Sequence, residues 1–126
     1  MRKVTQKKDP LTKSFGYAFQ GIFAVILKER NMKIHCFMTA AVVIFGAALK
    51  INRQEWFTCL ILFALVMSLE MVNTAVEAAV DLATDKIDPR AKLAKDAAAG
   101  AVLVAAIFAA VIGLIIFLPK LYAVFF

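Results

Sequence analysis

The feature that most constrains this chain is an unbroken apolar run near its carboxyl end. The 23 residues from Ala97 to Pro119 carry no formal charge, and about 20 predominantly apolar residues suffice to cross the hydrocarbon core of a bilayer as a helix. The chain as a whole is 63% hydrophobic, whereas an ordinary soluble domain has about 45 to 50%. The sequence therefore predicts a transmembrane helix at residues 95–119.

Two shorter uncharged runs predict two further spans. Ile34–Leu49 has 16 residues and Trp56–Leu69 has 14, so each run alone could be a buried helix of a soluble protein. The second run continues in a helical pattern as far as Asp81, which makes it long enough to cross the bilayer and carry its acidic end to one interface. We therefore expect an all-α integral membrane protein of one domain, residues 1–126, with these two spans at 34–51 and 55–81.

The basic residues are distributed unevenly along the chain. Eight Lys or Arg lie in residues 1–33 and four in residues 82–96, against three elsewhere. Because cytoplasmic segments carry the excess of Lys and Arg in membrane proteins, we expect the N-terminus and the 82–96 segment in the cytoplasm. The polar, basic first ten residues predict no cleavable signal peptide. The positive charge suits anionic lipids or nucleotide phosphates, and we expect no nucleic-acid partner, since no soluble basic domain is present.

Residues 11–30 predict an amphipathic helix on the cytoplasmic surface. A fourth span is less consistent with the Lys and Gln side chains on the face opposite its apolar residues. Four apolar residues fall within about 60° of one another on a wheel of 100° per residue: Phe15, Phe19, Ile22 and Ile26. Glu29 falls on the same apolar side, where a solvated surface charge is not expected. It is therefore a candidate metal ligand.

Small residues recur at every fourth position of the third span. These are Ala97, Ala101, Ala105, Ala109 and Gly113. Such a stripe lets another helix approach closely where lipid provides no hydrophobic drive for association. Three spans and one surface helix offer few internal partners for it, so we expect a homo-oligomer. The alternative is that the stripe only reflects a high alanine content.

A polar stripe at the end of the second span is the strongest candidate for a functional site. Glu70, Asn73, Thr74, Glu77 and Asp81 fall within about 100° of one another on a helix. Ionisable groups at membrane depth usually face a bundle interior or a water-filled cavity, where they bind cations or relay protons. A solvated helix end is the alternative, and it suits Asp81 better than Glu70, which directly follows the apolar run.

Basic side chains lie at the same membrane depth as this stripe. Lys95 and Asp96 begin the third span, and the Lys95 ammonium could hold phosphate oxygens; Arg90 and Lys92 just before them could do so or serve as solvated anchors. The chain has no phosphate-binding GxxxxGK[ST] loop, no GxGxxG and no histidine pair for zinc. The single histidine, His35, is interpreted as an interfacial or packing residue. The residues alone thus predict a cation-binding site that faces the cytoplasm. They do not by themselves indicate that ATP is a substrate.

Residues 70–81, with the sequence EMVNTAVEAAVD, resemble the E-x-x-N-[ST]-A-x-E-x-x-x-D signature of the prokaryotic diacylglycerol kinase family. Tyr17, Glu29 and Ala94-Lys95-Asp96 also stand where that family places them. The resemblance implies a homotrimer of three-span subunits with an N-terminal surface helix, in the cytoplasmic membrane of a bacterium. It further implies composite active sites that transfer the γ-phosphate of ATP to a lipid hydroxyl with the help of Mg²⁺.

The resemblance also implies a role for each residue of the site. Glu70 is expected to contact the lipid and to take its hydroxyl proton as a general base, while Glu29 and Glu77 are expected to bind magnesium. Asp81 is expected to support the site. The positions expected to contact the nucleotide are Tyr17, Glu29, Asn73, Glu77, Lys86, Ile87, Asp88, Lys95 and Asp96.

The lipid substrate is indicated by two segments and by Ala99. Residues 29–35 and 94–103 resemble the Gram-positive branch of the family, whose members mainly phosphorylate undecaprenol. By this resemblance, the branch that favours diacylglycerol has a serine where this chain has Ala99. We therefore expect undecaprenol as the substrate, with Ala99 in contact with it, and diacylglycerol as the alternative.

Two alternatives of other classes remain open from the residues alone. In a small proton-coupled transporter, Glu70 and Glu77 would relay protons, but a transporter places its coupling site near the midplane of the bilayer rather than at one interface. In a non-catalytic assembly protein the small-residue stripe would serve only for packing. That reading leaves the polar stripe unexplained.

Overall fold

A computed structural model describes residues 9–126, and this part of the chain is all-α. Its helices are α1 (Leu11–Lys28), α2 (Arg30–Ala48), α3 (Arg53–Ala83) and α4 (Pro89–Phe125). The all-α prediction is confirmed, and α2, α3 and α4 are each long and apolar enough to cross a membrane. The prediction about a signal peptide rests mainly on residues that lie outside the described range.

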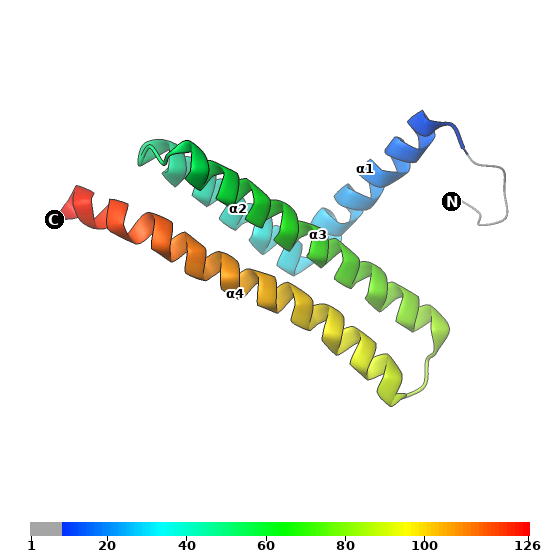
Figure 1. Ribbon diagram of the computed structural model, residues 1–126. Helices are drawn as coiled ribbons and strands as arrows, with labels where there is room; N and C mark the ends of the chain where they lie inside the picture. Colours follow the sequence, from blue (N-terminus) through cyan, green and yellow to red (C-terminus); the bar gives the residue numbers. More distant parts are fainter. Residues whose placement is uncertain (1–8) are drawn as a thin grey trace.

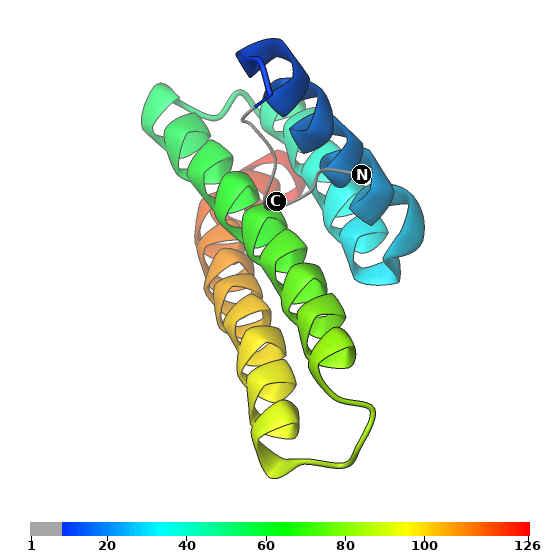
Figure 2. The ribbon, with the colours of Figure 1, turned by 90° about the vertical axis from the view of Figure 1, so that its right-hand side faces the viewer.

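The helices form a thin bundle with one diverging arm. Helices α3 and α4 run antiparallel and pack along most of their length, α2 packs against α3, and α1 turns away from the α2–α3 pair (Figures 1 and 2). With 31 and 37 residues, α3 and α4 extend for about 46 and 55 Å at 1.5 Å per residue. A hydrocarbon core is only about 30 Å thick. The α3–α4 connection can therefore project beyond the core while both helices still span it.

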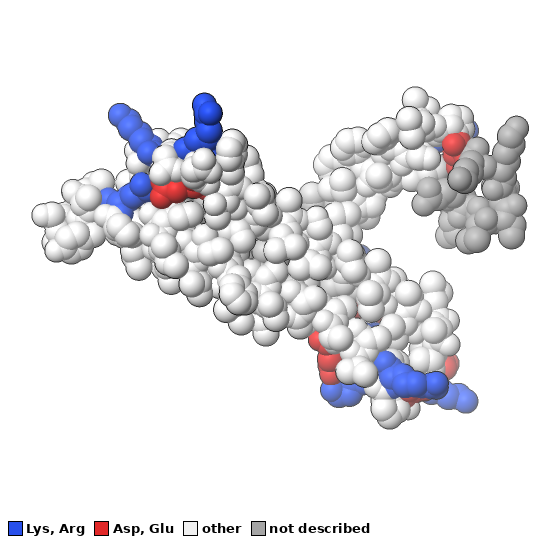
Figure 3. Space-filling model, viewed as in Figure 1, with Lys and Arg blue, Asp and Glu red and all other residues white. Residues whose placement is uncertain are grey.

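Charged side chains mark the two ends of this bundle and leave its middle apolar. In Figure 3, one group of Lys, Arg, Asp and Glu lies at the α2–α3 turn and a second at the α3–α4 connection, with a largely uncharged surface between them on the face shown. The exposed surface of all three long helices carries large apolar side chains such as Phe37, Ile61 and Phe108. This distribution fits a bilayer in contact with the middle of the bundle, and the chain is a multi-pass membrane protein.

Local sequence signals explain where α3 and α4 begin. The Asn52 side chain accepts a hydrogen bond from the Glu55 backbone N–H at 2.9 Å, and the Glu55 carboxylate accepts one from the Asn52 N–H at 3.0 Å. This reciprocal pair is a capping box, which satisfies two donors left free at a helix start. At α4, Asp88 accepts from the Arg90 backbone N–H at 2.8 Å. Pro89 occupies the first turn, where its missing N–H has no helical partner to lose.

Glu29 is the single residue that separates α1 from α2. Its backbone is extended, with φ −93° and ψ 123°, so the chain turns sharply between the two helices (Figure 1). The expectation that Glu29 lies on the apolar face of a helix is wrong, because α1 ends one residue earlier, at Lys28. Its carboxylate instead stands at the junction of α1 and α2.

The interior of the described chain is small. The buried apolar residues are Met32, Ile51, Cys59, Val66, Val102 and Ala105. The small-residue stripe of α4 is only partly covered: Ala105 is buried, whereas Ala97 and Ala101 are exposed, and a methyl group added at Gly113 would meet no atom within 4 Å. The bundle therefore leaves room beside α4 for a further helix or a lipid chain.

Candidate active site

Two polar side chains of α3 point into the bundle. Glu70 is 2% exposed and Asn73 is 7% exposed, and they are the buried polar residues of the described chain. Their spacing of three residues places them on one helix face, as the sequence predicts. A cavity of about 200 Å³ opens beside them. It is lined by Asn31, Ile34 and His35 of α2, Glu70 and Asn73 of α3, and Ala99, Val102, Leu103 and Ala106 of α4.

The Glu70 carboxylate has one ionisable neighbour at close range. Its Oε2 lies 3.7 Å from His35 Nε2, which is longer than a hydrogen bond. Oε2 is buried and accepts no hydrogen bond within the described chain, and the same holds for Asn73 Oδ1. Buried polar atoms are nearly always paired. Two unpaired acceptors beside one cavity therefore indicate a place where a ligand donates hydrogen bonds.

The remaining polar residues of the stripe make different contacts. The Asn73 side-chain amide donates to Glu77 Oε1 at 3.4 Å, and the Thr74 hydroxyl donates to the Glu70 backbone carbonyl at 3.1 Å. The Thr74 hydroxyl thus bonds to the backbone of its own helix. Asn73 connects the buried Glu70 position to Glu77, one helical step toward the α3–α4 connection.

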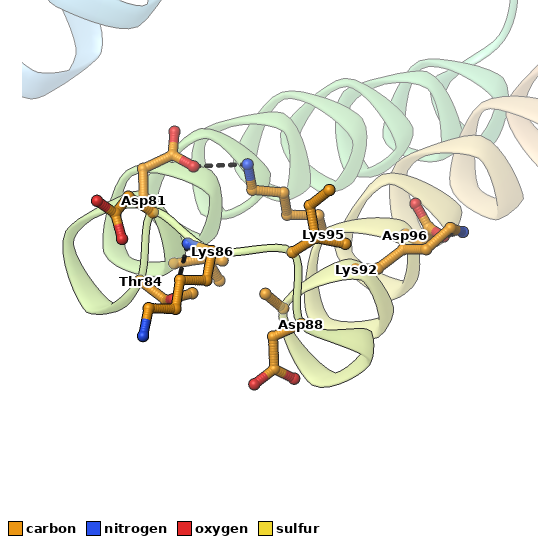
Figure 4. A pocket seen from close by; sticks show the side chains of 11 residues that line it. Asp81, Thr84, Lys86, Asp88, Lys92, Lys95 and Asp96 are labelled. Carbon is orange, nitrogen blue, oxygen red and sulfur yellow. Dashed lines mark hydrogen bonds and ion pairs between the residues drawn. The ribbon is translucent and has the colours of Figure 1, made fainter.

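A second and larger cavity lies at the α3–α4 connection (Figure 4). Its volume is about 550 Å³, and its lining combines four acidic and three basic side chains from the end of α3, the loop and the start of α4. Five of the predicted nucleotide-contacting residues lie here, together with Asp81: Lys86, Ile87, Asp88, Lys95 and Asp96. Lysine ammonium groups at a polar cavity of this size suit the phosphates of a nucleotide.

Ion pairs hold most of the charged groups around this second cavity. Lys95 Nζ lies 2.6 Å from Asp81 Oδ1 (Figure 4), and Lys92 pairs with Asp96 one turn along α4. Asp88 receives hydrogen bonds from the Arg90 guanidinium and backbone N–H, which hold the pKa of its carboxyl below the usual range. The charge of Lys95 also acts on Glu77.

The two cavities are separate within one chain. They share no lining residue, and the eleven residues from Glu70 to Asp81 correspond to about 16 Å along α3. Glu77 lies between them, half-buried, and it is coupled to Asn73 on one side and to Lys95 on the other. The sequence predicts that the residues of the polar stripe share one helix face, but it does not predict that they divide between two cavities.

Glu29 lies on the N-terminal side of the site, at the α1–α2 junction, whereas Tyr17 of α1 lines neither cavity. The charges of Glu29 and Glu77 both act on Glu70, so each of these two carboxylates lies within electrostatic range of Glu70. Tyr17 is half-buried on α1. Two carboxylates fit a magnesium site, because Mg²⁺ is commonly held by one or two carboxylates together with substrate phosphates. Within residues 9–126 no three His, Cys, Asp or Glu side chains cluster as metal ligands.

His35 is the residue whose place the sequence did not predict. The sequence favours an interfacial or packing role for it, whereas the structure places it in the lining of the Glu70 cavity, on α2. A lone ionisable side chain at the membrane depth of Glu70 on the preceding span is the signal that could have identified it. That signal is weak, because contact between the two residues depends on how α2 rotates against α3.

Comparisons with known proteins agree with this arrangement. The model of the family described as "Prokaryotic diacylglycerol kinase" matches residues 16–117. A protein of Bacillus subtilis named undecaprenol kinase is 49% identical over 109 residues, which cover 86% of this chain and 89% of that protein. A Synechocystis protein named diacylglycerol kinase is 40% identical over 109 residues, 86% of this chain and 62% of that protein. On these grounds the chain belongs to the prokaryotic diacylglycerol kinase family, a family of lipid kinases.

Proposed function

We propose that this protein transfers the γ-phosphoryl group of ATP to the hydroxyl of undecaprenol and so produces undecaprenyl phosphate. The observation that carries the proposal is the buried Glu70 carboxylate, whose Oε2 has no hydrogen-bond donor in the described chain and faces a cavity. A lipid hydroxyl supplies such a donor. Family membership argues against the transporter and assembly alternatives.

In this mechanism Glu70 is the general base. Its unpaired oxygen accepts the hydroxyl proton of the lipid while the hydroxyl oxygen forms a bond to the γ-phosphorus, and the bond from that phosphorus to the β-phosphate bridging oxygen breaks. Catalysis of phosphoryl transfer depends mostly on positioning and on neutralising charge. The buried position of Glu70 keeps water, a competing acceptor, away from the reacting oxygen.

The other residues bind and position the nucleotide. Glu29 and Glu77 would hold Mg²⁺, which when bound neutralises charge on the phosphates. Asn73 positions Glu77, to which it donates a hydrogen bond. Asp81 positions Lys95 for a phosphate oxygen. Further nucleotide contacts come from Tyr17, Lys86, Ile87, Asp88 and Asp96.

An apolar groove provides room for the hydrocarbon chain of the lipid. It has a volume of about 540 Å³, lies between α2, α3 and α4, and is lined almost entirely by apolar side chains. Ile34, His35 and Ala106 line both this groove and the Glu70 cavity, so the two are continuous. A chain in the groove would present its hydroxyl end to Glu70.

Ala99 lies where a substrate preference can arise, because it lines the Glu70 cavity opposite the carboxylate-bearing helix. An alanine offers no hydroxyl to the glycerol oxygens of diacylglycerol. The 49% identical relative is named undecaprenol kinase and the 40% identical relative is named diacylglycerol kinase. Both observations favour undecaprenol, and diacylglycerol remains the alternative substrate.

The proposal includes a cytoplasmic orientation and a homotrimer. The basic segments support an orientation with the N-terminus, α1 and the α3–α4 connection on the cytoplasmic side of the cytoplasmic membrane, where ATP is available. In this orientation α1 would lie on the membrane surface. The trimer is implied by the family resemblance, and the exposed small residues at the start of α4 support close contact with another subunit.

The test is phosphorylation of lipids by the purified protein in bilayers with labelled ATP and Mg²⁺. We expect undecaprenol to be phosphorylated with a higher kcat/KM than diacylglycerol, and Ala99→Ser to narrow the difference. Glu70→Gln should lower kcat by about 100- to 10,000-fold, as expected for loss of a general base, while ATP still binds. Absence of phosphorylated lipid with either substrate would refute the proposed activity.

A further inference from the structure

The burial of Glu70 limits how the proton it accepts from the lipid can leave. As a general base it carries the lipid proton after each phosphoryl transfer, and it must lose that proton before the next. With 2% of its surface exposed, direct exchange with water is hindered. The proton therefore needs a second group through which it can leave.

His35 is the one other ionisable side chain that lines the Glu70 cavity. Its Nε2 faces the unpaired Glu70 Oε2 at 3.7 Å, and its side chain is 18% exposed. The α4 side of the cavity contributes Ala99, Val102, Leu103 and Ala106, none of which can exchange a proton. The only remaining polar groups in the lining, Asn31 and Asn73, carry amides, which do not titrate near neutral pH.

We propose that His35 returns the Glu70 proton to water after each turnover. The inference rests on the proposed function of Glu70. The O–H bond of the protonated carboxyl breaks, its electron pair stays on the carboxylate, and the proton binds Nε2 of the neutral imidazole. The imidazolium, whose side chain is 18% exposed, then releases the Nε2 proton to water, which restores the carboxylate and the neutral imidazole that accepts at Nε2.

The geometry of the pair suits this step. Besides His35, the charged groups that act electrostatically on Glu70 are Glu29 at the α1–α2 junction and Glu77 on α3. Catalytic hydrogen bonds are often long before substrate is bound. A closure of under 1 Å brings the 3.7 Å separation into hydrogen-bond range. Histidine is the side chain best suited to exchange protons near neutral pH.

Chemical rescue of His35→Ala provides the test. In lipid bilayers with ATP, Mg²⁺ and undecaprenol, we expect kcat to fall roughly 100-fold, a loss typical of acid–base groups, with the KM for ATP nearly unchanged. Added imidazole should restore part of the lost kcat, in proportion to its free-base concentration. Rescue should be absent in wild type and in Glu70→Gln.

Two more variants separate proton exchange from a structural role. His35→Gln keeps an N–H donor and similar volume but cannot exchange a proton, so it should lose as much activity as His35→Ala. Cys36→Ala, the adjacent residue outside both cavities, is the matched control and should behave as wild type. If His35→Ala proves misfolded, as judged by lost ATP binding, His35→Gln decides the outcome alone.

Three results would overturn the proposal: wild-type kcat in His35→Gln, wild-type kcat in His35→Ala, or a folded His35→Ala that imidazole fails to rescue. The same assay keeps the two ideas apart. An inactive wild-type protein refutes the lipid kinase itself, whereas an active wild type with active His35 variants refutes only the proton route.

Discussion

At the residue scale, the contact between Lys95 and Asp81 connects the end of α3 with the start of α4. The ammonium and carboxylate lie 2.6 Å apart, yet the side chains are 40% and 67% exposed. Exposed ion pairs contribute little to stability, because water and salt screen them. The main role of this ion pair is therefore to hold the Lys95 ammonium at the rim of the larger cavity.

This placement leads to a prediction for Asp81→Asn. We expect the KM for ATP to rise a few-fold, because Lys95 loses its fixed position, while kcat and thermal stability stay near the wild-type values. Steady-state kinetics at varied ATP concentrations would measure both constants. Glu55→Gln, which removes the charge from an ion pair at the far end of α3, is the matched control without a kinetic effect. A large fall in kcat with unchanged KM for ATP would contradict the supporting role of Asp81.

The Asp88 carboxyl gives a prediction about pH. The Arg90 guanidinium, whose terminal nitrogen lies 2.9 Å from Asp88 Oδ2, and the Arg90 N–H hold the pKa of Asp88 below its usual range. A lowered folded-state pKa means that the α4 cap is fully formed at neutral pH and is lost as the pH falls through that pKa. In Arg90→Gln we expect the pKa of Asp88 to rise toward the ordinary aspartate value. Carboxyl-carbon NMR of labelled aspartate would measure it, and an unchanged midpoint would refute the assignment.

The sequence predicts which residues share a face of one helix better than it predicts which residues of two helices are in contact. The three-residue offset alone put Glu70 and Asn73 on one inward face, and the structure buries both. The neighbour of Glu70 on α2 could not be predicted, because the His35 contact depends on the rotation of one helix against another. The place of Glu29 was missed for a local reason: a single extended residue ends α1 without a glycine or proline to signal it.

At the scale of elements, the α2–α3 turn is held by close packing on Gly46. A Cβ built there would lie 2.9 Å from Trp56 Cη2 and 3.0 Å from Ile51 Cδ1. Real Cβ atoms do not approach neighbours so closely, so the indole or the helix must move. Glycine at this position thus lets the end of α2 approach the start of α3.

We therefore predict that Gly46→Ala destabilises the bundle. Overpacking of this kind typically costs about 1 to 3 kcal/mol, which should appear as a lower thermal unfolding temperature in detergent. Gly16→Ala is the matched control, because its added Cβ meets no atom within 4 Å and alanine favours a helix. Equal stability of the two variants would show that the Trp56 side chain simply moves away.

The sequence predicts the presence of the helices more accurately than it predicts where they end. Long uncharged runs predicted three apolar helices, and all three are present. The third helix was expected to end at Pro119, but α4 continues through it to Phe125. A proline inside a helix normally breaks or kinks it. Here Lys120, just beyond Pro119, pairs with Glu55 at 3.1 Å, which ties the last turns of α4 to α3.

At the scale of the whole molecule, the two cavities of the candidate site lie apart within one chain. The Glu70 cavity and the cavity of Lys95 are distinct, whereas phosphoryl transfer needs the lipid hydroxyl in contact with the γ-phosphorus. Part of the gap is spanned by the triphosphate itself. The rest is explained most simply if the Glu70 of one subunit works with the nucleotide-binding residues of another, beside the exposed small residues Ala97 and Ala101.

Such a shared site predicts complementation between two inactive variants. Glu70→Gln and Lys95→Ala would each be inactive alone, but a mixture refolded together contains pairs in which an intact Glu70 meets an intact Lys95 of a neighbour. We expect the mixture to regain a substantial fraction of wild-type lipid phosphorylation. The double variant Glu70→Gln with Lys95→Ala, mixed with Lys95→Ala, is the matched control and should stay inactive, because neither chain provides Lys95. If the first mixture also stays inactive although crosslinking shows mixed oligomers, each active site must be formed by a single chain.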